Sequence, residues 1–159
     1  MKIMIFTEGT IIMHKNGLGF TQEEVVRQVI EKEPSVKSYD EYVPIGRASQ
    51  KLKQWKDRGA EIVYITSRKG VEVEQVQEVL RRHDFPSGLL EYRKDGKEYK
   101  DVAMRVMPDI LIEDDCESIG GTFEMIYPNI RSELRFKIKS IVVKEFEGID
   151  RLSDDPQLL

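Results

Sequence analysis

Four short runs of apolar residues along the chain predict strands that are buried on both faces. The runs cover residues 1–8, 61–65, 109–112 and 139–143, and only Lys2 interrupts the apolar start of the first. Continuous apolar runs, as opposed to alternating ones, are typical of parallel sheets that helices cover on both sides. Polar residues follow the first three runs directly. Polar chemistry is therefore expected at the carboxyl ends of three predicted strands.

Helical patterns separate these strands. Thr21 and Glu24 have the spacing of a capping box, which predicts a helix that begins after Thr21 and ends before Pro34. Gly59 is expected to close a second helix, and Ser67 is available near the start of a third. The apolar faces of the four predicted helices are formed by Val25, Val26, Val29 and Ile30; by Ile45, Ala48, Leu52 and Trp55; by Val73, Val76, Val79 and Leu80; and by Tyr99, Val102, Ala103, Val106 and Met107.

Strands that alternate with helices predict an α/β fold, because parallel neighbours need crossover connections. We expect a three-layer, doubly wound parallel sheet of the Rossmann-like type with at most a minimal helical lid. Residues 1–144 would form this single domain, residues 14–42 its small lid, and residues 145–159 a C-terminal strap or tail. Ligands of such sheets bind beyond the carboxyl ends of the strands. The residues expected to converge there are Glu8, Thr66 to Arg68, and Glu113 to Asp115.

Composition narrows the classes of function. The 159 residues suit one domain, and 25 basic against 29 acidic residues give a net charge of −4, which makes nucleic acid an unexpected partner. One cysteine and two histidines exclude a disulfide framework and a Cys-rich or His-based metal cage. No apolar run approaches the roughly 20 residues of a membrane helix, and the start lacks the order of a signal peptide. We expect a soluble, cytoplasmic protein with no membrane partner.

The residues at the strand ends carry a resemblance. In chain order they read FTEGT, YITSR and ILIEDD, and a lysine-rich helix start precedes the third. From residue 3 to about residue 143 this pattern resembles the haloacid dehalogenase (HAD) superfamily, whose members are mostly magnesium-dependent phosphatases. The first motif of that family is Asp-x-Asp-x-Thr after an apolar strand, and residues 6–10 align with it without gaps. The resemblance implies a HAD-like fold and a magnesium cofactor.

The resemblance also implies roles for individual residues. Thr66, with Ser67 beside it, falls on the second motif, a hydroxyl that bonds the transferring phosphoryl group. Lys97 or Lys100 would be the lysine of the third motif, which offsets the charge of the phosphate. Asp114, with Asp115 next to it, falls on the acidic fourth motif that holds magnesium. The implied ligand-binding residues are Gly9, Thr10, Thr66, Ser67 and Arg68, and the implied metal ligands are Glu8, Asp114 and Asp115.

The first motif departs from the family pattern at both of its acidic positions. Phe6 stands at the position of the nucleophile, and Glu8 stands at the position of the general acid and base. A phenyl ring supplies neither an attacking oxygen nor a metal ligand, so ordinary aspartyl-phosphate chemistry is not available as aligned. Glu8 can still serve as an acid or base, or simply pair with Arg68 or a nearby lysine.

Three hypotheses of function follow. The first is a HAD-like protein without the aspartyl nucleophile that binds magnesium, a small phosphorylated molecule, or both. The second is a magnesium-dependent phosphomonoesterase in which Glu8 or an activated water replaces the missing aspartate. A distant third is a toprim-like nucleotidyl-transfer domain, which shares a strand ending in Glu-Gly and a later acidic pair. His14 is expected to be a packing or surface residue, and Cys116 to be inert.

Overall fold

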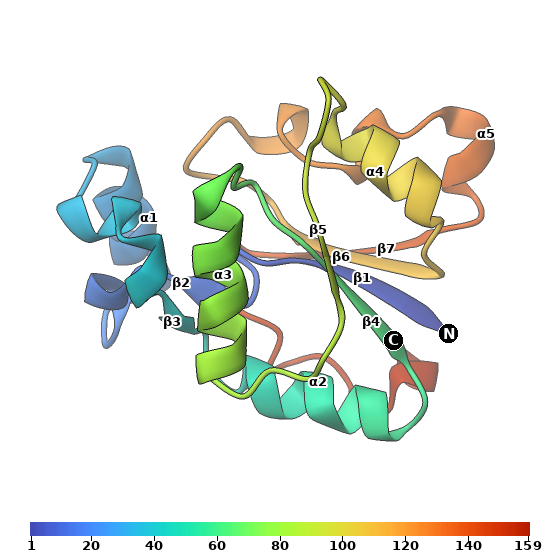
Figure 1. Cartoon of the computed structure of the whole chain (residues 1–159), viewed down its shortest axis with the longest axis horizontal. Helices are drawn as coiled ribbons and strands as arrows, with labels where there is room; N and C mark the ends of the chain where they lie inside the picture. The colour runs from blue at the N-terminus through green and yellow to red at the C-terminus, as the bar shows by residue number, and fades with distance from the viewer.

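The computed structural model describes residues 1–159 (Figure 1). Its strands are β1 (Lys2–Phe6), β2 (Ile12–Met13), β3 (Val43–Pro44), β4 (Glu61–Ile65), β5 (Leu89–Glu91), β6 (Ile110–Asp114) and β7 (Lys139–Val143). Its α-helices are α1 (Gln22–Ile30), α2 (Ala48–Asp57), α3 (Val71–Arg82), α4 (Tyr99–Val106) and α5 (Ser132–Arg135). Short 3-10 helices are η1 (Lys15–Gly17), η2 (Pro34–Lys37), η3 (Tyr39–Glu41), η4 (Gly121–Phe123), η5 (Tyr127–Asn129) and η6 (Pro156–Leu158).

Five strands form one parallel sheet in the order β5-β4-β1-β6-β7. The central strand β1 pairs with β4 on one side and with β6 on the other, so that Ile3 lies opposite Ile62 and Ile110. The chain moves outward from β1 to β4 and β5, and then returns past β1 to β6 and β7. Strand order therefore reverses at β1, where doubly wound sheets have their ligand crevice. The predicted parallel, doubly wound sheet is confirmed.

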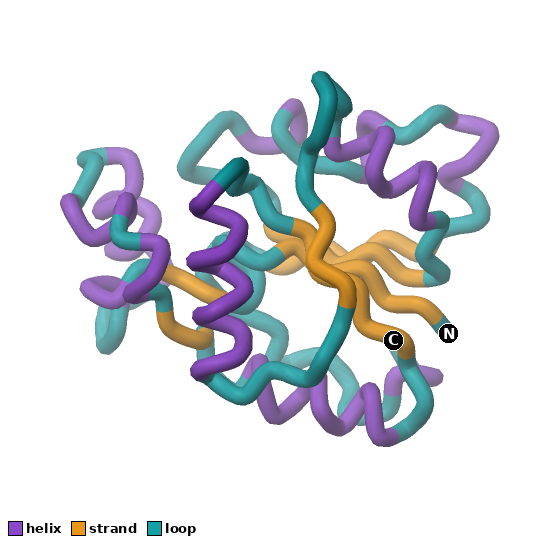
Figure 2. The backbone as a smooth tube through the Cα atoms, in the orientation of Figure 1, coloured by secondary structure: helices purple, strands orange, loops and turns teal.

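Helices cover both faces of this sheet, as Figure 2 shows by the orange strands between purple helices. Side chains of β1 alternate between the faces: Ile3 and Ile5 join a core cluster with α2 and α3, whereas Met4 joins one with α4 and η5. This alternation follows from the geometry of a strand. Because both faces are buried, neither shows the polar positions of a half-exposed strand, which explains the continuous apolar runs.

The strands agree with the sequence prediction except at three points. The ranges 61–65 and 139–143 are confirmed, but β6 covers residues 110–114 in place of the predicted 109–112, and β1 ends at Phe6, two residues earlier than predicted. The backbone carbonyl of Thr7 accepts hydrogen bonds from the amides of Ile11 and Ile12, at 2.9 and 3.0 Å, and the chain turns back there. The pattern also missed β5 and the β2–β3 pair, which are two or three residues long and too short to show a period.

The helices begin where local signals place them, with one correction. At α1, Thr21 Oγ1 accepts a hydrogen bond from the Glu24 amide, and the Glu24 carboxylate accepts one from the Thr21 amide, which confirms the capping box. Helix α3 begins at Val71 after Gly70, so Ser67 does not cap it. The Ser67 amide and hydroxyl instead donate to Glu8. The Ser67 prediction was wrong because a tertiary partner outcompeted the helix end.

Residues 14–42 form η1, α1, η2 and η3, a small helical unit at the carboxyl side of the sheet, left of α3 in Figure 1. Arg82 of α3 donates a hydrogen bond to the backbone oxygen of Asp40 in η3, at 2.7 Å. Residues 145–159 run along α2, and Ile149 is fully buried. Lys51 donates to the Leu152 carbonyl at 2.6 Å. Both chain ends lie at the amino ends of the strands (Figure 1). None of the helices is both long and apolar enough to cross a membrane.

Candidate functional site

A cavity of about 340 Å³ lies at the carboxyl ends of the strands around β1. Each strand that ends there contributes polar side chains within a few residues of its last position. The helical unit of residues 14–42 and helix α4 contribute apolar and aromatic side chains to its walls. Its lining includes Phe6, Glu8, Gly9, His14, Ser67, Arg68, Arg93, Tyr99, Asp114, Cys116, Ser118, Glu124 and Glu145, together with Val29, Val36 and Tyr42 of residues 14–42. The predicted convergence of residues 8, 67–68 and 114 is therefore observed.

The carboxylate of Glu8 is tied to the second strand end. Its Oε1 accepts a hydrogen bond from the Thr66 hydroxyl. Its Oε2 accepts bonds from the Ser67 amide at 3.1 Å, the Ser67 hydroxyl at 3.3 Å and the Thr7 hydroxyl at 3.0 Å. Thr66 is fully buried, and the side chain of Glu8 is only 12% exposed. Glu8 thus fills the hydroxyl and amide donors that the sequence assigned to a phosphate.

Phe6 lies on the α4 side of the sheet and borders the cavity. Its ring meets the ring of Tyr99 edge to face, with centroids 5.5 Å apart. Such a pair contributes about 0.5–1.5 kcal/mol beyond the apolar area it buries. Burial also raises the pKa of the Tyr99 hydroxyl, which therefore stays neutral. Phe6, which the resemblance aligns with the nucleophile, is thus part of an aromatic contact.

Arg68 contacts both Glu8 and Tyr39, which belongs to the helical unit of residues 14–42. Its Nε lies 3.7 Å from Glu8 Oε1, and its guanidinium lies 4.3 Å from the ring centroid of Tyr39 in η3. Burial is the largest single influence and would lower the pKa of Arg68, but the charge of Glu8, together with smaller contributions from Tyr39, Tyr42 and Glu72, outweighs it and the pKa is raised. Arg68 Nε also donates to Ser67 Oγ at 2.9 Å. The guanidinium is therefore charged and held from three directions.

Two further carboxylates, those of Asp114 and Glu145, lie next to Gly9. Asp114 Oδ2 accepts a bond from the Thr10 hydroxyl at 2.8 Å, and Glu145 accepts bonds from the Ser118 amide and hydroxyl at 2.6 and 2.7 Å. Burial raises the pKa of Asp114. Burial, with the nearby charge of Asp114 as a smaller contribution, raises the pKa of Glu145 to about 7. This side of the cavity thus carries less negative charge at neutral pH than its carboxylates suggest.

Replacing Gly9 by alanine is expected to lower the free energy of unfolding by about 2 kcal/mol. Gly9 has φ +80°, where a side chain costs roughly 1–2 kcal/mol, and an added Cβ would lie 2.8 Å from Asp114 Oδ2. Gly19→Ala is the matched control, because Gly19 has φ +82° and nothing within 4 Å of a Cβ. Urea unfolding of both variants measures the difference. Equal losses would show that the Asp114 contact contributes nothing.

Arg93 supplies the second cationic side chain of the cavity. Its guanidinium lies 4.2 Å from the ring centroid of Tyr99. Its Nε is buried and has no hydrogen-bond partner, and it is the single buried side-chain nitrogen or oxygen in the chain of which this is true. A buried donor without a partner costs about 1–3 kcal/mol. Arg93 therefore lies in the cavity with unused hydrogen-bonding capacity.

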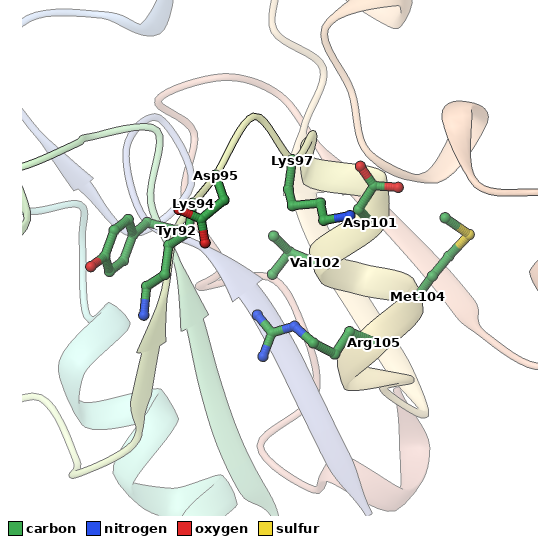
Figure 3. Close-up of a pocket in the computed structure, with 8 residues that line it drawn as sticks. All are labelled: Tyr92, Lys94, Asp95, Lys97, Asp101, Val102, Met104 and Arg105. Carbon is green, nitrogen blue, oxygen red and sulfur yellow. The ribbon is translucent and has the colours of Figure 1, made fainter.

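The lysines of the third motif lie elsewhere. Lys97 borders a separate surface hollow of about 470 Å³ beside α4, and Figure 3 shows it next to Asp101 at the start of that helix. Lys100 Nζ forms an ion pair with Glu98 at 2.6 Å on the surface. Neither lysine lines the cavity at the strand ends. The cations that the structure brings there are Arg68 and Arg93.

The residues present do not fit a magnesium site. Magnesium requires several oxygen ligands in a near-octahedral arrangement. No group of three or more His, Cys, Asp or Glu side chains in the structure is arranged to hold a metal ion. Asp115 Oδ1 accepts a hydrogen bond from the Glu145 amide at 3.0 Å, and Asp115 does not line the cavity. Both oxygens of Asp114 accept hydrogen bonds, from Thr10 and from the Cys116 amide. Phe6 adds no oxygen.

Three further polar residues near these strand ends have structural roles. Glu113 faces the α4 side of the sheet, where its carboxylate accepts bonds from the Ile126 and Tyr127 amides at 2.6 and 2.9 Å. His14 is buried, and its Nε2 lies 2.8 Å from Gln28 Oε1. Burial raises the pKa of the Cys116 thiol, so the reactive thiolate is disfavoured.

Sequence reasoning missed Glu145 and Arg93. Glu145 lies two residues after β7, and Arg93 lies two residues after β5. The rule that polar residues after parallel strands share one edge applies to both. It would have found Glu145 from the predicted run 139–143. It could not find Arg93, because β5 has only three residues and no detectable pattern.

Comparison with known proteins assigns the family. The model of the LNS2 domain of PITM 1-3 matches residues 20–110, more than half of the chain. The chain belongs to the LNS2 family. The LNS2 domain has a HAD-like fold, so the predicted superfamily is confirmed and the toprim alternative is not the family of this chain. No curated protein matches the LNS2 chain in sequence.

Solved structures agree with this fold. The class C acid phosphatase from Bacillus anthracis with tungstate bound is 16% identical, with a TM-score of 0.57 over 92% of the LNS2 chain and 68% of its own chain. A chain of the Pnkp1/Rnl/Hen1 complex is 14% identical, with a TM-score of 0.57 over 91% of the LNS2 chain. The LNS2 chain spans 46% of that second chain. At these identities the likeness shows that the chains share an α/β fold.

Proposed function

We propose that this LNS2 chain is a non-hydrolytic HAD-like domain that binds a small phosphorylated molecule in the cavity beside β1. Two features support the absence of hydrolysis. Phe6 replaces the nucleophile and packs against Tyr99. The carboxylate of Glu8 accepts bonds from Thr66 and Ser67, the donors that would orient a transferring phosphoryl group. A phosphate in this cavity has neither an attacking oxygen nor its usual donors.

The proposal that the cavity binds a phosphorylated molecule rests on the unpaired Nε of Arg93. A guanidinium presents five donors in a planar fork that suits phosphate, and such charge-assisted bonds are among the strongest in proteins. An anionic group in the cavity would bond the terminal nitrogens of Arg93, and a turn of the guanidinium toward it would give the buried Nε the partner it lacks. Neutral ligands cannot do this equally well. The cavity therefore favours a ligand with a phosphate group.

The residues that line the cavity indicate the chemistry of the rest of that ligand. A volume of about 340 Å³ is within the size range of small-molecule sites. Val29, Val36 and Tyr42 of residues 14–42 line it, as do the rings of Phe6 and Tyr99. Burial raises the pKa of Tyr42, so its hydroxyl stays neutral beside a bound anion. The favoured ligand is a phosphomonoester with an apolar or aromatic part.

A divalent cation is not part of this proposal, because the carboxylates present do not fit magnesium. Arg93 and Arg68 would supply the positive charge that a metal supplies in a phosphatase. Binding is therefore expected to survive EDTA, and added magnesium is expected to leave the affinity unchanged.

Replacing Arg93 by glutamine is expected to weaken binding of a phosphomonoester about tenfold or more. Hydrogen bonds to a charged group contribute about 1.5–3 kcal/mol, and each 1.4 kcal/mol is tenfold in affinity. A panel of AMP, glycerol 3-phosphate, glucose 6-phosphate and phosphotyrosine, titrated in EDTA and followed by thermal shift and calorimetry, selects the probe. Arg131→Gln is the matched control, because Arg131 is exposed and pairs only with Glu133.

A hydrolysis assay with p-nitrophenyl phosphate, with and without magnesium, tests the other half of the proposal. No turnover above the buffer rate is expected from the natural chain. Turnover that disappears in Glu8→Gln would contradict the proposal and favour the phosphomonoesterase hypothesis. Equal phosphomonoester affinities of the natural chain and Arg93→Gln would remove Arg93 from the ligand site.

A further inference from the structure

Four hydrogen-bond donors and a cation converge on the carboxylate of Glu8. The Thr66 hydroxyl donates to one oxygen, and the Ser67 amide and hydroxyl donate to the other. The Thr7 hydroxyl shares its single proton between that second oxygen and the Ile65 carbonyl. Arg68 Nε lies 3.7 Å from the first oxygen. Hydroxyls, a backbone amide and a guanidinium are the groups that proteins use to bind free oxyanions. These groups together suit an oxyanion, and the oxyanion that they bind is the Glu8 carboxylate of the same chain.

These donors stay in place without Glu8. The Arg68 amide donates to Thr66 Oγ1 at 3.1 Å, which fixes the hydroxyl beside its own strand end. The Arg68 guanidinium packs on Tyr39 and donates to Ser67 Oγ. The Ser67 amide belongs to the backbone after β4, and the Thr66 amide bonds to the Glu91 carbonyl at 3.0 Å. The residues at the carboxyl end of β4 therefore hold these donors in place, and Glu8 is not needed for their position.

We propose that Glu8 is a specificity-determining residue, a tethered anion that fills the oxyanion-binding donors at the end of β4 and keeps free oxyanions out of them. A carboxylate on the same chain competes at an effective concentration in the millimolar range or above, which weakly bound free anions do not match. The phosphate of a bound ligand is thereby directed to Arg93. This deepens the proposed function and rests on it only for the position of that ligand.

Removal of the carboxylate should open the donors to solution. Glu8 borders the cavity and its side chain is 12% exposed, so Glu8→Ala leaves the Thr66 hydroxyl and the Ser67 amide facing the existing space. It also leaves Arg68 without its anionic partner. Inorganic phosphate is the probe, because it is small and has no apolar part to bind the walls of the cavity, and any binding at Arg93 is common to the natural chain and the variant.

Glu8→Ala is expected to bind inorganic phosphate at least tenfold more tightly than the natural chain, measured by calorimetry in EDTA at pH 7.5. Glu147→Ala is the matched control, because Glu147 is an exposed glutamate outside the cavity that pairs with Arg151 and contacts none of the four donors. It is expected to bind phosphate as the natural chain does. In the Glu8→Ala background, Thr66→Val should abolish the gain and Thr66→Ser should keep it.

Formate provides a second readout. It is a small carboxylate without a tether, so it should raise the melting temperature of Glu8→Ala and not that of the natural chain, relative to chloride at equal ionic strength. If Glu8→Ala is unfolded without ligand, formate or phosphate should refold it, which near-UV circular dichroism detects.

Three results would overturn the inference: no gain in phosphate affinity by folded Glu8→Ala, an equal gain by Glu147→Ala, or retention of the gain in the Thr66→Val background. An unfolded Glu8→Ala that neither formate nor phosphate refolds would also overturn it. The outcome is independent of the Arg93 experiment, because it uses free phosphate and does not require the natural chain to bind any phosphomonoester. Failure of the proposed function therefore remains distinguishable.

Discussion

Trp55→Ala is expected to lower the free energy of unfolding by about 3–5 kcal/mol, as is usual for a fully buried aromatic side chain. Trp55 of α2 is 0% exposed and lies in the core cluster between the sheet and residues 145–159. Its Nε1 donates a hydrogen bond to the Ser153 carbonyl at 2.9 Å. The substitution therefore removes core packing and an attachment point of the C-terminal strap together. Urea or guanidinium unfolding of the variant measures the loss.

Trp55→Phe separates the two contributions, because it keeps much of the ring and loses the donor. An intermediate loss is expected, together with faster amide hydrogen exchange at residues 152–155. A loss near 1 kcal/mol for Trp55→Ala would mean that residues 145–159 do not pack on α2 in solution. Unchanged exchange in Trp55→Phe would mean that the Ser153 bond does not hold the strap.

Raising the pH from 5 to 8 is expected to destabilise the protein by several kcal/mol. Burial raises the pKa of Glu113 to about 7, against the opposing hydrogen bonds from two backbone amides, and burial also raises that of Glu145 to about 7. An unfolded glutamate has a pKa near 4.5. Between these values the folded chain keeps a proton that the unfolded chain has lost, so stability falls as pH rises and levels off above about 7. Each group contributes about 3 kcal/mol at full effect.

Denaturant unfolding at pH 5, 6.5 and 8 measures this slope, and the variants Glu113→Gln and Glu145→Gln assign it. Each variant should remove part of the slope, because glutamine does not titrate. Glu24 and Glu33, whose pKa values are lowered mainly by hydrogen bonds, act in the opposite direction but only as the pH falls below about 4.5. A stability that rises from pH 5 to 8 would contradict the assignment of both buried glutamates.

Much of the fold could be predicted from local signals. The Thr21 capping box, the helical spacing that ends before Pro108, and the run at residues 61–65 each depend on neighbours in sequence, and the structure confirms them. Ser67 shows the limit of such signals. It has the composition of a helix start, yet its amide and hydroxyl bind Glu8, which is 59 residues away. No local pattern contains that partner.

The sequence by itself determined that the sheet is parallel, which of the recognised strand ends meet, and that Phe6 and Glu8 occupy one of them, because apolar runs joined by crossover helices form parallel strands whose carboxyl ends share one edge. Only the tertiary structure decided how the side chains at that edge pair. It turned Asp115 toward the Glu145 backbone, brought Arg93 in from a strand too short to recognise, and tied the Glu8 carboxylate to Thr66 and Ser67. A hydrogen bond needs its donor and acceptor atoms within about 3 Å of each other, whereas the order of the strands places a side chain only to within several residues.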